Sequence, residues 1–533
     1  MEINFACEKM KIPETQHAVQ LVGANQLILN TRRPVHKPGR FQILCKVEAC
    51  GLCFSDLKLL RQFSAHPRKA SIVSGIDPKA LEEMPHYVPE EKPTVPGHEA
   101  VVRVVAVGEN VVRYRPGERY LVQTDYRWLP TPQSNSAFGY NFEGGLQEYV
   151  LMDERVITAP DGESMLIPAP EELSASAIAL CEPWACVEDA YSEAQRTGFK
   201  SDGKMLVVGE GPLPLGKAMR CKPDQLPEGQ FSDIVYYGSE PDVVERLFGL
   251  LSPGGLIVIV QGNRQFGRPV TVPIGRIHYG GVRIVGTRET DFEEALRVIP
   301  RSTELRQGDV VHVIGAGGPM GTMHVIRAIS QGVVRHIYAS DLSEERLQLL
   351  NQVAGRLAAE KGIGFTAYNP SLTQVHTKFN YIVLMVPVPS LAAEAVNSAD
   401  DGAIINVFAG IPADKTAAVD LDAYIRKRCY FVGTSGSTLQ DMKVVLDKLR
   451  RGMLDTNLSV AAISGLDGAI DGIHAVEKNL IPGKIVVYPF AKGLGLTPLS
   501  KLSVELASVG SKLNGGLWNA EAERELKRIF AEP

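Results

Sequence analysis

The chain has 533 residues, of which 44% are hydrophobic and 22% charged, a composition that excludes a disordered or collagen-like protein. The formal net charge of −5 argues against non-specific binding of nucleic acid, and no stretch is long and apolar enough to span a membrane. Eight cysteines in so long a chain, with no secretory signal at its start, indicate metal ligands or nucleophiles in a reducing cytoplasm rather than disulfides.

Residues 1–199 consist of short Val- and Ile-rich runs broken by proline and glycine, which predict a β-rich domain. Short strands return over 453–489, and we expect them to complete that domain. Between these regions, apolar strands alternate with glycine-rich turns and helices, the pattern of a doubly wound parallel sheet. The last segment, 490–533, is amphipathic and predicts two helices with a role in packing or subunit contact. The sequence therefore predicts an α/β protein with a separate β-rich domain.

The middle of the chain contains an internal repeat. A shift of 147 residues lays 231–262 over 378–409 without gaps. The upstream copy is the shorter one, because only 15 residues follow its glycine-rich turn where the downstream copy has 57. We therefore expect a truncated, degenerate copy at 200–304, with no room for the helix, second strand and third strand that complete such a unit, and a complete nucleotide-binding unit at 305–452. Since Pro214 replaces the third glycine of the short copy, we interpret this copy as a spacer or an interface rather than a second cofactor site.

The downstream copy carries a dinucleotide-binding pattern. The apolar segment 310–315 predicts a strand, AGGPMG a turn, and the residues after it a helix. Such a turn lets backbone N–H groups approach a pyrophosphate at the positive end of the helix. Twenty residues after Gly321, Asp341 ends the next apolar run, where an acidic side chain binds the ribose hydroxyls and repels a 2′-phosphate. The pattern favours NAD over NADP, although Ala316 stands where the first glycine is expected.

Cysteine, histidine and glutamate gather in three segments of the β-rich domain. These are ACGLCFSDLK with Cys50 and Cys53, PGHEA with His98 and Glu99, and LCEPWACVEDAY with Cys181, Glu182 and Cys186. A catalytic zinc takes three protein ligands of these types and keeps one position open for substrate. Ligands so widely separated fit an enzyme better than a zinc finger, whose ligands come in close pairs. The sequence therefore predicts a catalytic metal site beside the nucleotide fold.

Five segments resemble motifs of the zinc-dependent medium-chain alcohol and polyol dehydrogenases. They are GLCFSD, PGHEAVVRVVAVGENV, RPGERYLV, EGGLQEYV and CEPWACVEDAY, and the resemblance runs from about residue 25 to 489. The nearest branch is that of the L-sorbose-1-phosphate reductase-like proteins, which share the GPMG turn and GKIVVYP. The resemblance implies a GroES-like catalytic domain and a Rossmann domain. It also implies hydride transfer between NAD(H) and a secondary alcohol or ketone of a polyol, sugar or sugar phosphate.

The same resemblance implies roles for single residues. Cys53 and His98 would bind one catalytic zinc. The carboxylate ligand would be Glu99 or Glu182, and the sequence leaves this choice open. Ser55 would pass the proton of the substrate hydroxyl towards solvent. The cofactor would lie against Gly315, Gly317, Gly318, Met320, Gly321 and Asp341.

Three departures from the family pattern bear on the chemistry. Lys58 stands where a relay histidine is common, so either the relay is rewired or Lys58 contacts an anionic substrate; we count it among the catalytic candidates. A polar insert, residues 61–93, lies between Cys53 and His98, and we expect it to form a substrate lid or an interface loop. The lobe from Tyr120 to Phe142 contains no cysteine, so we expect no second, structural zinc.

The expected partner is a small alcohol or sugar, and the expected assembly is a cytoplasmic homo-oligomer, a dimer or tetramer. Two alternatives remain open. In an epimerase or lyase, NAD would be held tightly and recycled without net turnover. In a redox-sensing or assembly scaffold, the duplicated fold would serve without catalysis. Loss of a ligand residue would favour the scaffold, and none of the four expected ligands is missing.

Overall fold

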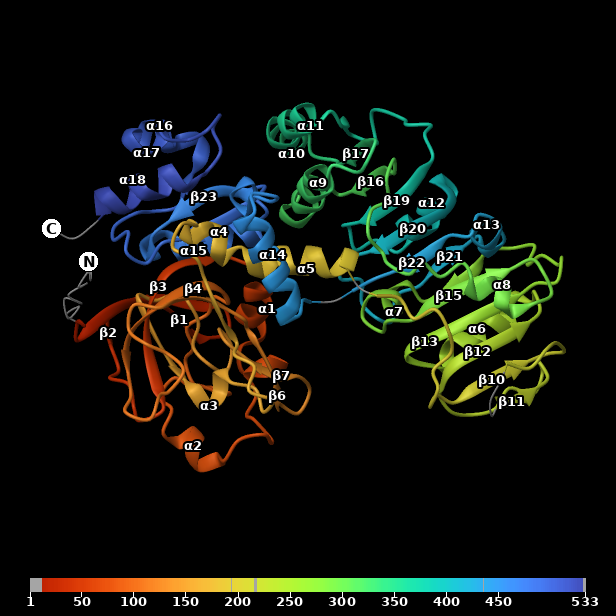
Figure 1. The fold of residues 1–533 in the computed structure, drawn as a ribbon, viewed down its shortest axis with the longest axis horizontal. Coiled ribbons are helices and arrows are strands. Elements are labelled where there is room, and N and C mark those ends of the chain that lie inside the picture. The colour runs from red at the N-terminus through yellow and green to blue at the C-terminus, as the bar shows by residue number, and fades with distance from the viewer. Residues whose placement is uncertain (1–11, 193, 215–217, 435, 531–533) are drawn as a thin grey trace, which may run out of the picture. The chain divides into compact units, whose positions relative to one another are not determined.

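The structure is a computed structural model that describes residues 12–192, 194–214, 218–434 and 436–530. The chain forms two compact units, of which the first is coloured red to gold and blue in Figure 1 and the second yellow-green to light blue. The first unit comprises the residues up to Ala185 and those from Leu439 onward, and the second comprises Cys186–Thr438. The expected boundaries at 199, 304, 452 and 489 divide the chain more finely than this and stay predictions.

An eight-stranded sheet forms the core of the first unit. Its strand order is β25-β23-β24-β3-β4-β5-β9, and β8 also pairs with β3. These strands are β3 (Gln42–Gly51), β4 (Glu99–Val107), β5 (Arg119–Val122), β8 (Tyr149–Asp153), β9 (Leu166–Pro168), β23 (Val460–Ser464), β24 (Lys484–Val487) and β25 (Thr497–Pro498). β3 and β4 are antiparallel neighbours, with Gly51 opposite Glu99. The end of β3 therefore lies beside the start of β4, and both ends carry expected metal ligands.

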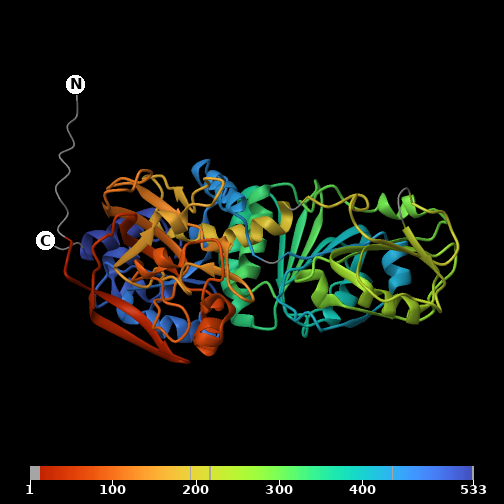
Figure 2. The same ribbon diagram turned by 90° about the horizontal axis from the view of Figure 1, so that it is seen from below.

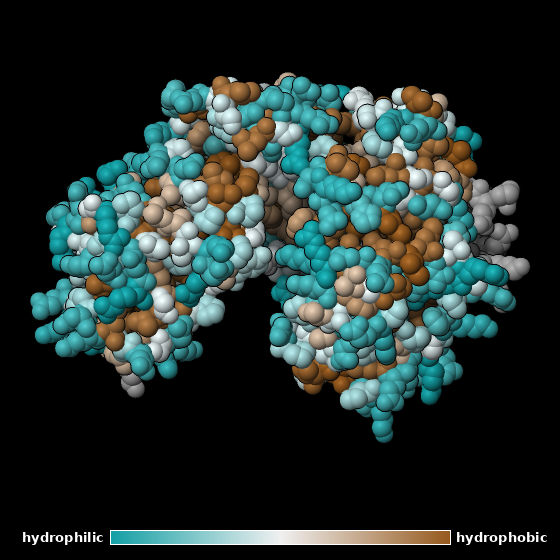
Figure 3. All heavy atoms as spheres, turned by 180° about the vertical axis from the view of Figure 1, so that it is seen from behind, coloured by the Kyte–Doolittle hydropathy of each residue, from teal (hydrophilic) through white to brown (hydrophobic). Residues whose placement is uncertain are grey.

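Hairpins and short helices surround this sheet. They are β1 (Thr15–Gly23), β2 (Gln26–Pro34), α1 (Phe54–Gln62), α2 (Pro78–Glu82), β6 (Asp125–Pro130), β7 (Asn135–Ala137), α3 (Glu154–Ile157), α4 (Ala175–Ala179), α14 (Leu439–Arg450) and α15 (Ala469–Glu477). Helix α5 (Cys181–Ser192) begins in the first unit and ends in the second. In the view of Figure 3, apolar patches on the surface are interrupted by hydrophilic side chains. Among the described residues, no helix combines the length and the hydropathy that crossing a membrane requires.

The polar insert folds around a buried lysine. The Lys69 ammonium group donates hydrogen bonds to the backbone carbonyls of Glu90 and Lys92, at 3.0 and 2.8 Å, and to that of Val88. Its side chain is fully buried, and burial lowers the pKa of Lys69 to about 7. Lys69 thus ties the backbone of the insert together from within.

The second unit contains two parallel sheets, seen from a second side in Figure 2. The complete copy has the order β18-β17-β16-β19-β20-β22, and the short copy has the order β11-β10-β12-β13-β15. The strands of the complete copy are β16 (Val310–Ile314), β17 (His336–Ser340), β18 (Gly364–Tyr368), β19 (Phe379–Leu384), β20 (Ala399–Val407) and β22 (Tyr430–Val432). Those of the short copy are β10 (Met205–Val208), β11 (Ala218–Cys221), β12 (Phe231–Tyr237), β13 (Leu251–Val260) and β15 (Arg283–Thr287). Two further strands, β14 (Val270–Val272) and β21 (Ala417–Val419), pair outside both sheets.

The two copies differ in the connection between their first two strands. In the complete copy α9 (Pro319–Gln331) connects β16 to β17, and the other helices are α10 (Glu344–Leu350), α11 (Arg356–Lys361), α12 (Ser390–Ser398) and α13 (Leu421–Arg426). The short copy has α6 (Pro241–Leu250), α7 (Ile274–His278) and α8 (Phe292–Leu296), but no helix among the described residues between β10 and β11. The expectation of no second strand was wrong: β11 pairs with β10 in the place that β17 takes beside β16. β11 has four residues, and nine residues connect it to β10, fewer than the dozen or more that a helical crossover takes.

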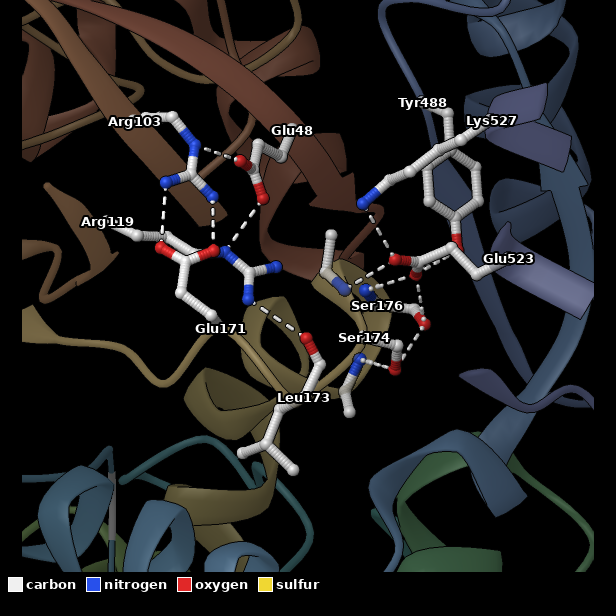
Figure 4. Close-up of polar contacts among 12 residues, drawn as sticks. Glu48, Arg103, Arg119, Glu171, Leu173, Ser174, Ser176, Tyr488, Glu523 and Lys527 are labelled. Atoms are coloured by element: carbon white, nitrogen blue, oxygen red, sulfur yellow. Dashed lines mark hydrogen bonds and ion pairs between the residues drawn. The ribbon is translucent and has the colours of Figure 1, made fainter. Parts of the chain in front are cut away.

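The C-terminal tail, which belongs to the first unit, has three α-helices rather than two helices among its described residues. These are α16 (Leu502–Glu505), α17 (Ala507–Gly510) and α18 (Ala520–Phe530). Figure 4 shows the buried carboxylate of Glu523 accepting hydrogen bonds from the backbone N–H groups of Ala175 and Ser176, at 2.7 and 2.9 Å, and from the hydroxyls of Ser176 and Tyr488, both at 2.9 Å. Although burial opposes ionisation, Lys527 and the N–H donors keep the pKa of Glu523 below its ordinary value. The tail therefore holds the start of α4, the helix that precedes α5.

We expect Glu523→Ala to lower the free energy of unfolding of the first unit by about 3 kcal/mol, because it leaves several buried donors without an acceptor. Thermal unfolding followed by circular dichroism measures this loss. The control is Glu521→Ala, which removes an exposed carboxylate from the same helix and should leave the melting temperature within about 1 °C. Equal melting temperatures for the two variants would contradict the anchoring role.

Candidate metal and nucleotide sites

Cys53 lies in the turn between β3 and α1, where it is the residue that caps the helix. Its backbone N–H donates to Asp56 Oδ2 at 3.0 Å, and this closes the first turn of α1. Asp56 Oδ1 lies 3.1 Å from Nδ1 of His98, which is buried. A carboxylate on one ring nitrogen fixes the tautomer and leaves the lone pair on the other, as in metal-binding histidines. Asp56 therefore orients His98, with Nε2 directed at the Cys53 end of the helix.

The Ser55 hydroxyl lies within hydrogen-bond distance of both expected ligands, Cys53 and His98. Its oxygen lies 3.0 Å from Cys53 Sγ and 3.1 Å from His98 Nε2. One candidate metal atom from each of Cys53, His98 and Glu99 lies within 4.8 Å of the others. Three donors of these types at such separations can surround one ion, and zinc binds thiolate, imidazole and carboxylate.

Glu99 is completely buried at the start of β4. Its Oε1 accepts a hydrogen bond at 2.5 Å from Lys484 on β24, and the same ammonium group donates to the Leu52 carbonyl at 2.6 Å. Burial alone would lower the pKa of Lys484, but Glu99 raises it above its ordinary value, so this lysine stays charged. The other oxygen, Oε2, has no hydrogen-bond partner among the described residues. An unpaired oxygen of a buried carboxylate is costly unless a cation binds it, so Glu99 also fits a metal site.

Gly51 has a steric reason to be glycine. A Cβ atom at this position would lie 2.0 Å from Glu99 Oε2 on the neighbouring strand. The carboxylate therefore occupies the space that any side chain at this position would need. The glycine of the GLCFSD segment thus admits Glu99 to the site.

The other expected residues differ in their burial and in their position relative to the group of Cys53, His98 and Glu99. Glu182 lies in the first turn of α5 and does not belong to the group of three. Burial raises the pKa of Glu182, and the charge of Glu99 raises it further. Lys58 lies on the exposed side of α1. Cys50 is fully buried, and burial, Asp56 and Glu99 raise its pKa well above the ordinary value, so Cys50 stays a thiol.

Two residues near this centre were missed by the sequence reasoning. Asp56 belongs to the quoted GLCFSD segment, so a carboxylate three residues after Cys53 was a usable signal. Lys484 belongs to GKIVVYP, where nothing local distinguishes it from a surface lysine. Its position follows only from the pairing of β24 with β3.

The nucleotide turn of the complete copy has the expected geometry. Gly315 follows β16 with φ = 83°, a conformation that favours glycine. A Cβ on Gly321 would lie 2.4 Å from the Gly315 carbonyl oxygen, and one on Gly317 would lie 2.9 Å from Asp341 Oδ2. Asp341 Oδ2 accepts a hydrogen bond from the Gly317 N–H at 3.0 Å. Gly318 caps α9, and Met320 lies in its first turn, partly exposed. All six expected cofactor residues thus lie in or against this turn.

The corresponding turn of the short copy is filled by a tyrosine. Gly209 has φ = 90°, like its counterpart Gly315. The Tyr237 hydroxyl donates to the Pro212 carbonyl at 2.6 Å, and a Cβ on Gly211 would lie 2.3 Å from the tyrosine ring. The ring therefore packs directly against the backbone of the turn at Gly211.

Known proteins resemble the chain in its sequence and its fold. Residues 39–161 match the family model described as "Alcohol dehydrogenase GroES-like domain". L-sorbose 1-phosphate reductase of Klebsiella pneumoniae is 22% identical over 96% of this chain and 97% of its own length. Mannitol-1-phosphate 5-dehydrogenase of Aliivibrio fischeri is 25% identical over 46% of this chain and 63% of its own length. The solved structure of 2R,3R-butanediol dehydrogenase from Bacillus subtilis has a TM-score of 0.54 and 19% identity, covering 89% of this chain and 100% of that one.

These comparisons confirm the fold class and the resemblance. The GroES-like domain and the parallel Rossmann-type sheets are both present, with the short copy as an addition. The resemblance to zinc-type alcohol and polyol dehydrogenases, including L-sorbose 1-phosphate reductase, is confirmed as well. The chain spans 63% of the length of the first curated relatives it matches.

Proposed function

We propose that this protein is a zinc-dependent oxidoreductase that transfers a hydride between NAD(H) and a secondary alcohol or ketone of a polyol, sugar or sugar phosphate. The observation that carries the proposal is the group formed by Cys53, His98 and Glu99, in which the buried Glu99 Oε2 has no partner among the residues that the structure describes. The relatives support the substrate class, since their names include a sorbose-phosphate reductase and a mannitol-phosphate dehydrogenase. We propose one catalytic zinc and no structural zinc, in a cytoplasmic protein.

In this proposal Cys53, His98 and Glu99 would hold the zinc, and Glu182 would be the alternative carboxylate ligand. When bound, zinc acts as a Lewis acid that makes the alkoxide of the substrate accessible near neutral pH. Asp56 keeps His98 Nδ1 protonated and its Nε2 available. Ser55 lies next to both donor atoms, so its hydroxyl is placed to accept the proton of the substrate hydroxyl and pass it on.

The complete copy holds NAD in the same proposal. Backbone N–H groups at the start of α9 bind the pyrophosphate, and the residues that would contact it are Gly315, Gly317, Gly318, Met320 and Gly321. Asp341 would accept hydrogen bonds from the ribose hydroxyls. The protein supplies the position of the nicotinamide, and the hydride chemistry belongs to the cofactor. Lys58, exposed three residues beyond Ser55, is proposed to contact an anionic group of the substrate.

Metal analysis and a hydride-transfer assay test the proposal. We expect about one zinc per chain of the purified full-length protein, and NAD reduction with a polyol or polyol phosphate that stops on chelation and returns with added zinc. Full turnover by the zinc-free protein would contradict it. Co-purification of NAD without reduction of added NAD would instead indicate an epimerase or lyase.

Asp341→Asn tests the cofactor preference. The amide oxygen can still accept the Gly317 hydrogen bond, but the charge that repels a 2′-phosphate is lost. We expect the ratio of kcat/KM for NAD to that for NADP to fall at least tenfold, since a like-charge contact costs several kcal/mol and about 1.4 kcal/mol is tenfold. The control is Glu344→Gln, which removes an exposed charge three residues further on and should leave the ratio unchanged. An unchanged ratio in Asp341→Asn would mean that another residue selects the cofactor.

A further inference from the structure

The two copies of the second unit meet through equivalent strands. β14 and β21 occupy the same place in the two copies, 147 residues apart, and they pair with each other antiparallel. Thr271 lies opposite Ala418, which is its own counterpart in the repeat, and Val270 and Val272 pair with Val419 and Ala417 in the same symmetric way. A strand that pairs antiparallel with its own counterpart, centred on equivalent residues, lies on a local two-fold axis.

The close contacts between the copies occur twice, as a two-fold axis requires. Gly286 and Gly433 are counterparts, and so are His278 and Ile425. A Cβ on Gly286 would lie 2.6 Å from Cδ1 of Ile425, and a Cβ on Gly433 would lie 2.9 Å from Cα of His278. Each glycine therefore lets a helix of the other copy approach closely. Gly286 faces α13, and Gly433 faces α7, which is the counterpart of α13.

Hydrogen bonds also join the two copies, although they are not repeated on both sides of the axis. The Gly275 N–H donates to the Lys415 carbonyl at 3.1 Å. The side chain of Asp422, the counterpart of Gly275, accepts from the Gly267 N–H at 3.3 Å. The Tyr424 hydroxyl donates to the Ile284 carbonyl at 2.9 Å, and Arg283 donates to the Gly433 carbonyl at 3.1 Å.

The contact is also apolar. One hydrophobic cluster contains residues of both copies, among them Val270, Val272, Ile274, Ile277, Val419 and Leu421, all of them completely buried. The last strand of each sheet, β15 in one and β22 in the other, lies beside its counterpart, as the green and blue strands in Figure 1 show. A buried apolar centre beside a symmetric strand pair resembles a permanent subunit interface.

We infer that the short copy is a built-in partner of the nucleotide-binding copy: it covers, within one chain, a self-complementary face that a second chain would otherwise cover. A face that contacts its own counterpart across a two-fold axis is isologous, the arrangement of a symmetric dimer. Because the short copy occupies this face, a dimer or tetramer of the protein must assemble through other surfaces. The inference concerns assembly alone and does not depend on the proposed chemistry.

Disulfide trapping in the full-length protein tests this. Thr271 and Ala418 are both exposed and directly opposed, so the double variant Thr271→Cys/Ala418→Cys places two thiols at a separation that a disulfide spans. Equal amounts of ¹⁵N-labelled and unlabelled variant are mixed, unfolded, refolded together and oxidised. We expect a 271–418 cross-link whose two peptides always carry the same label, on a chain that migrates at monomer mass without reductant.

Mixed-label cross-links or a covalent dimer would show that the face is shared between chains and overturn the inference. Absence of the cross-link would overturn the pairing itself. The single variants Thr271→Cys and Ala418→Cys are the controls for disulfides to native cysteines. The oxidised and the reduced double variant are expected to have the same sedimentation coefficient, since the disulfide joins residues already paired within one chain. A smaller assembly after oxidation would show that the disulfide had replaced a pairing between chains, and would count against the inference.

Discussion

The Cys53→Ala variant is expected to purify without zinc and to lose more than about 100-fold in kcat/KM. Partners that only orient metal ligands contribute about 10- to 100-fold, so removal of a ligand should exceed that range. Cys53 supplies the only sulfur of the group formed with His98 and Glu99, and among the described residues no other cysteine belongs to that group. Zinc content by mass spectrometry of the metal and initial rates of NAD reduction measure the two losses.

Cys50→Ala is the matched control. It removes a thiol three residues away, from the same short segment, whose raised pKa keeps it protonated. We expect this variant to keep its zinc and to lose at most a fewfold in activity, with some loss of stability because Cys50 is buried. If Cys53→Ala kept zinc and Cys50→Ala lost it, the assignment of the two cysteines would be reversed.

The sequence predicted those parts of the site that depend on local motifs. Cys53, His98 and Glu99 each stand in a short segment with a recognisable pattern, and the structure brings one donor atom of each within 4.8 Å of the others. Asp56 was visible in the same segment, but its contact with His98 depends on how the turn after β3 faces the start of β4. Lys484 was beyond prediction, because its neighbours come from the opposite end of the chain.

The fold follows the same division between local and distant information. The 147-residue repeat predicted two copies of one α/β unit, and both sheets are present. The short connection after the first strand suggested that no second strand could follow it. β11 was therefore not predicted, although a strand of four residues requires only a short segment of chain. The symmetric pairing of β14 with β21 was not predicted either, since each strand has only three residues and their pairing depends on the packing of both copies. Periodicity along the chain identifies elements, but not which distant elements pair.

The largest effect on stability is expected for Lys484→Met, and it should depend on zinc. Lys484 and Glu99 form a buried ion pair, and removal of one partner leaves an uncompensated charge at a cost of about 3–5 kcal/mol. Zinc bound to Glu99 would supply positive charge in place of the lysine. We therefore expect the variant to lose about 3–5 kcal/mol of unfolding free energy in chelator and clearly less in zinc. Melting temperatures of variant and wild type under both conditions measure this difference.

Lys69→Met is the control, because Lys69 is another buried lysine, bound to carbonyls and not to a carboxylate. It should destabilise the protein equally with and without zinc. The lost hydrogen bond from Lys484 to the Leu52 carbonyl also acts equally in both conditions, so the zinc-dependent part of the effect reports on the charges beside Lys484, of which Glu99 contributes most. If Lys484→Met were equally destabilising in zinc and in chelator, zinc would not neutralise Glu99. The carboxylate ligand would then be Glu182, and Glu99 would serve only to position the end of β3.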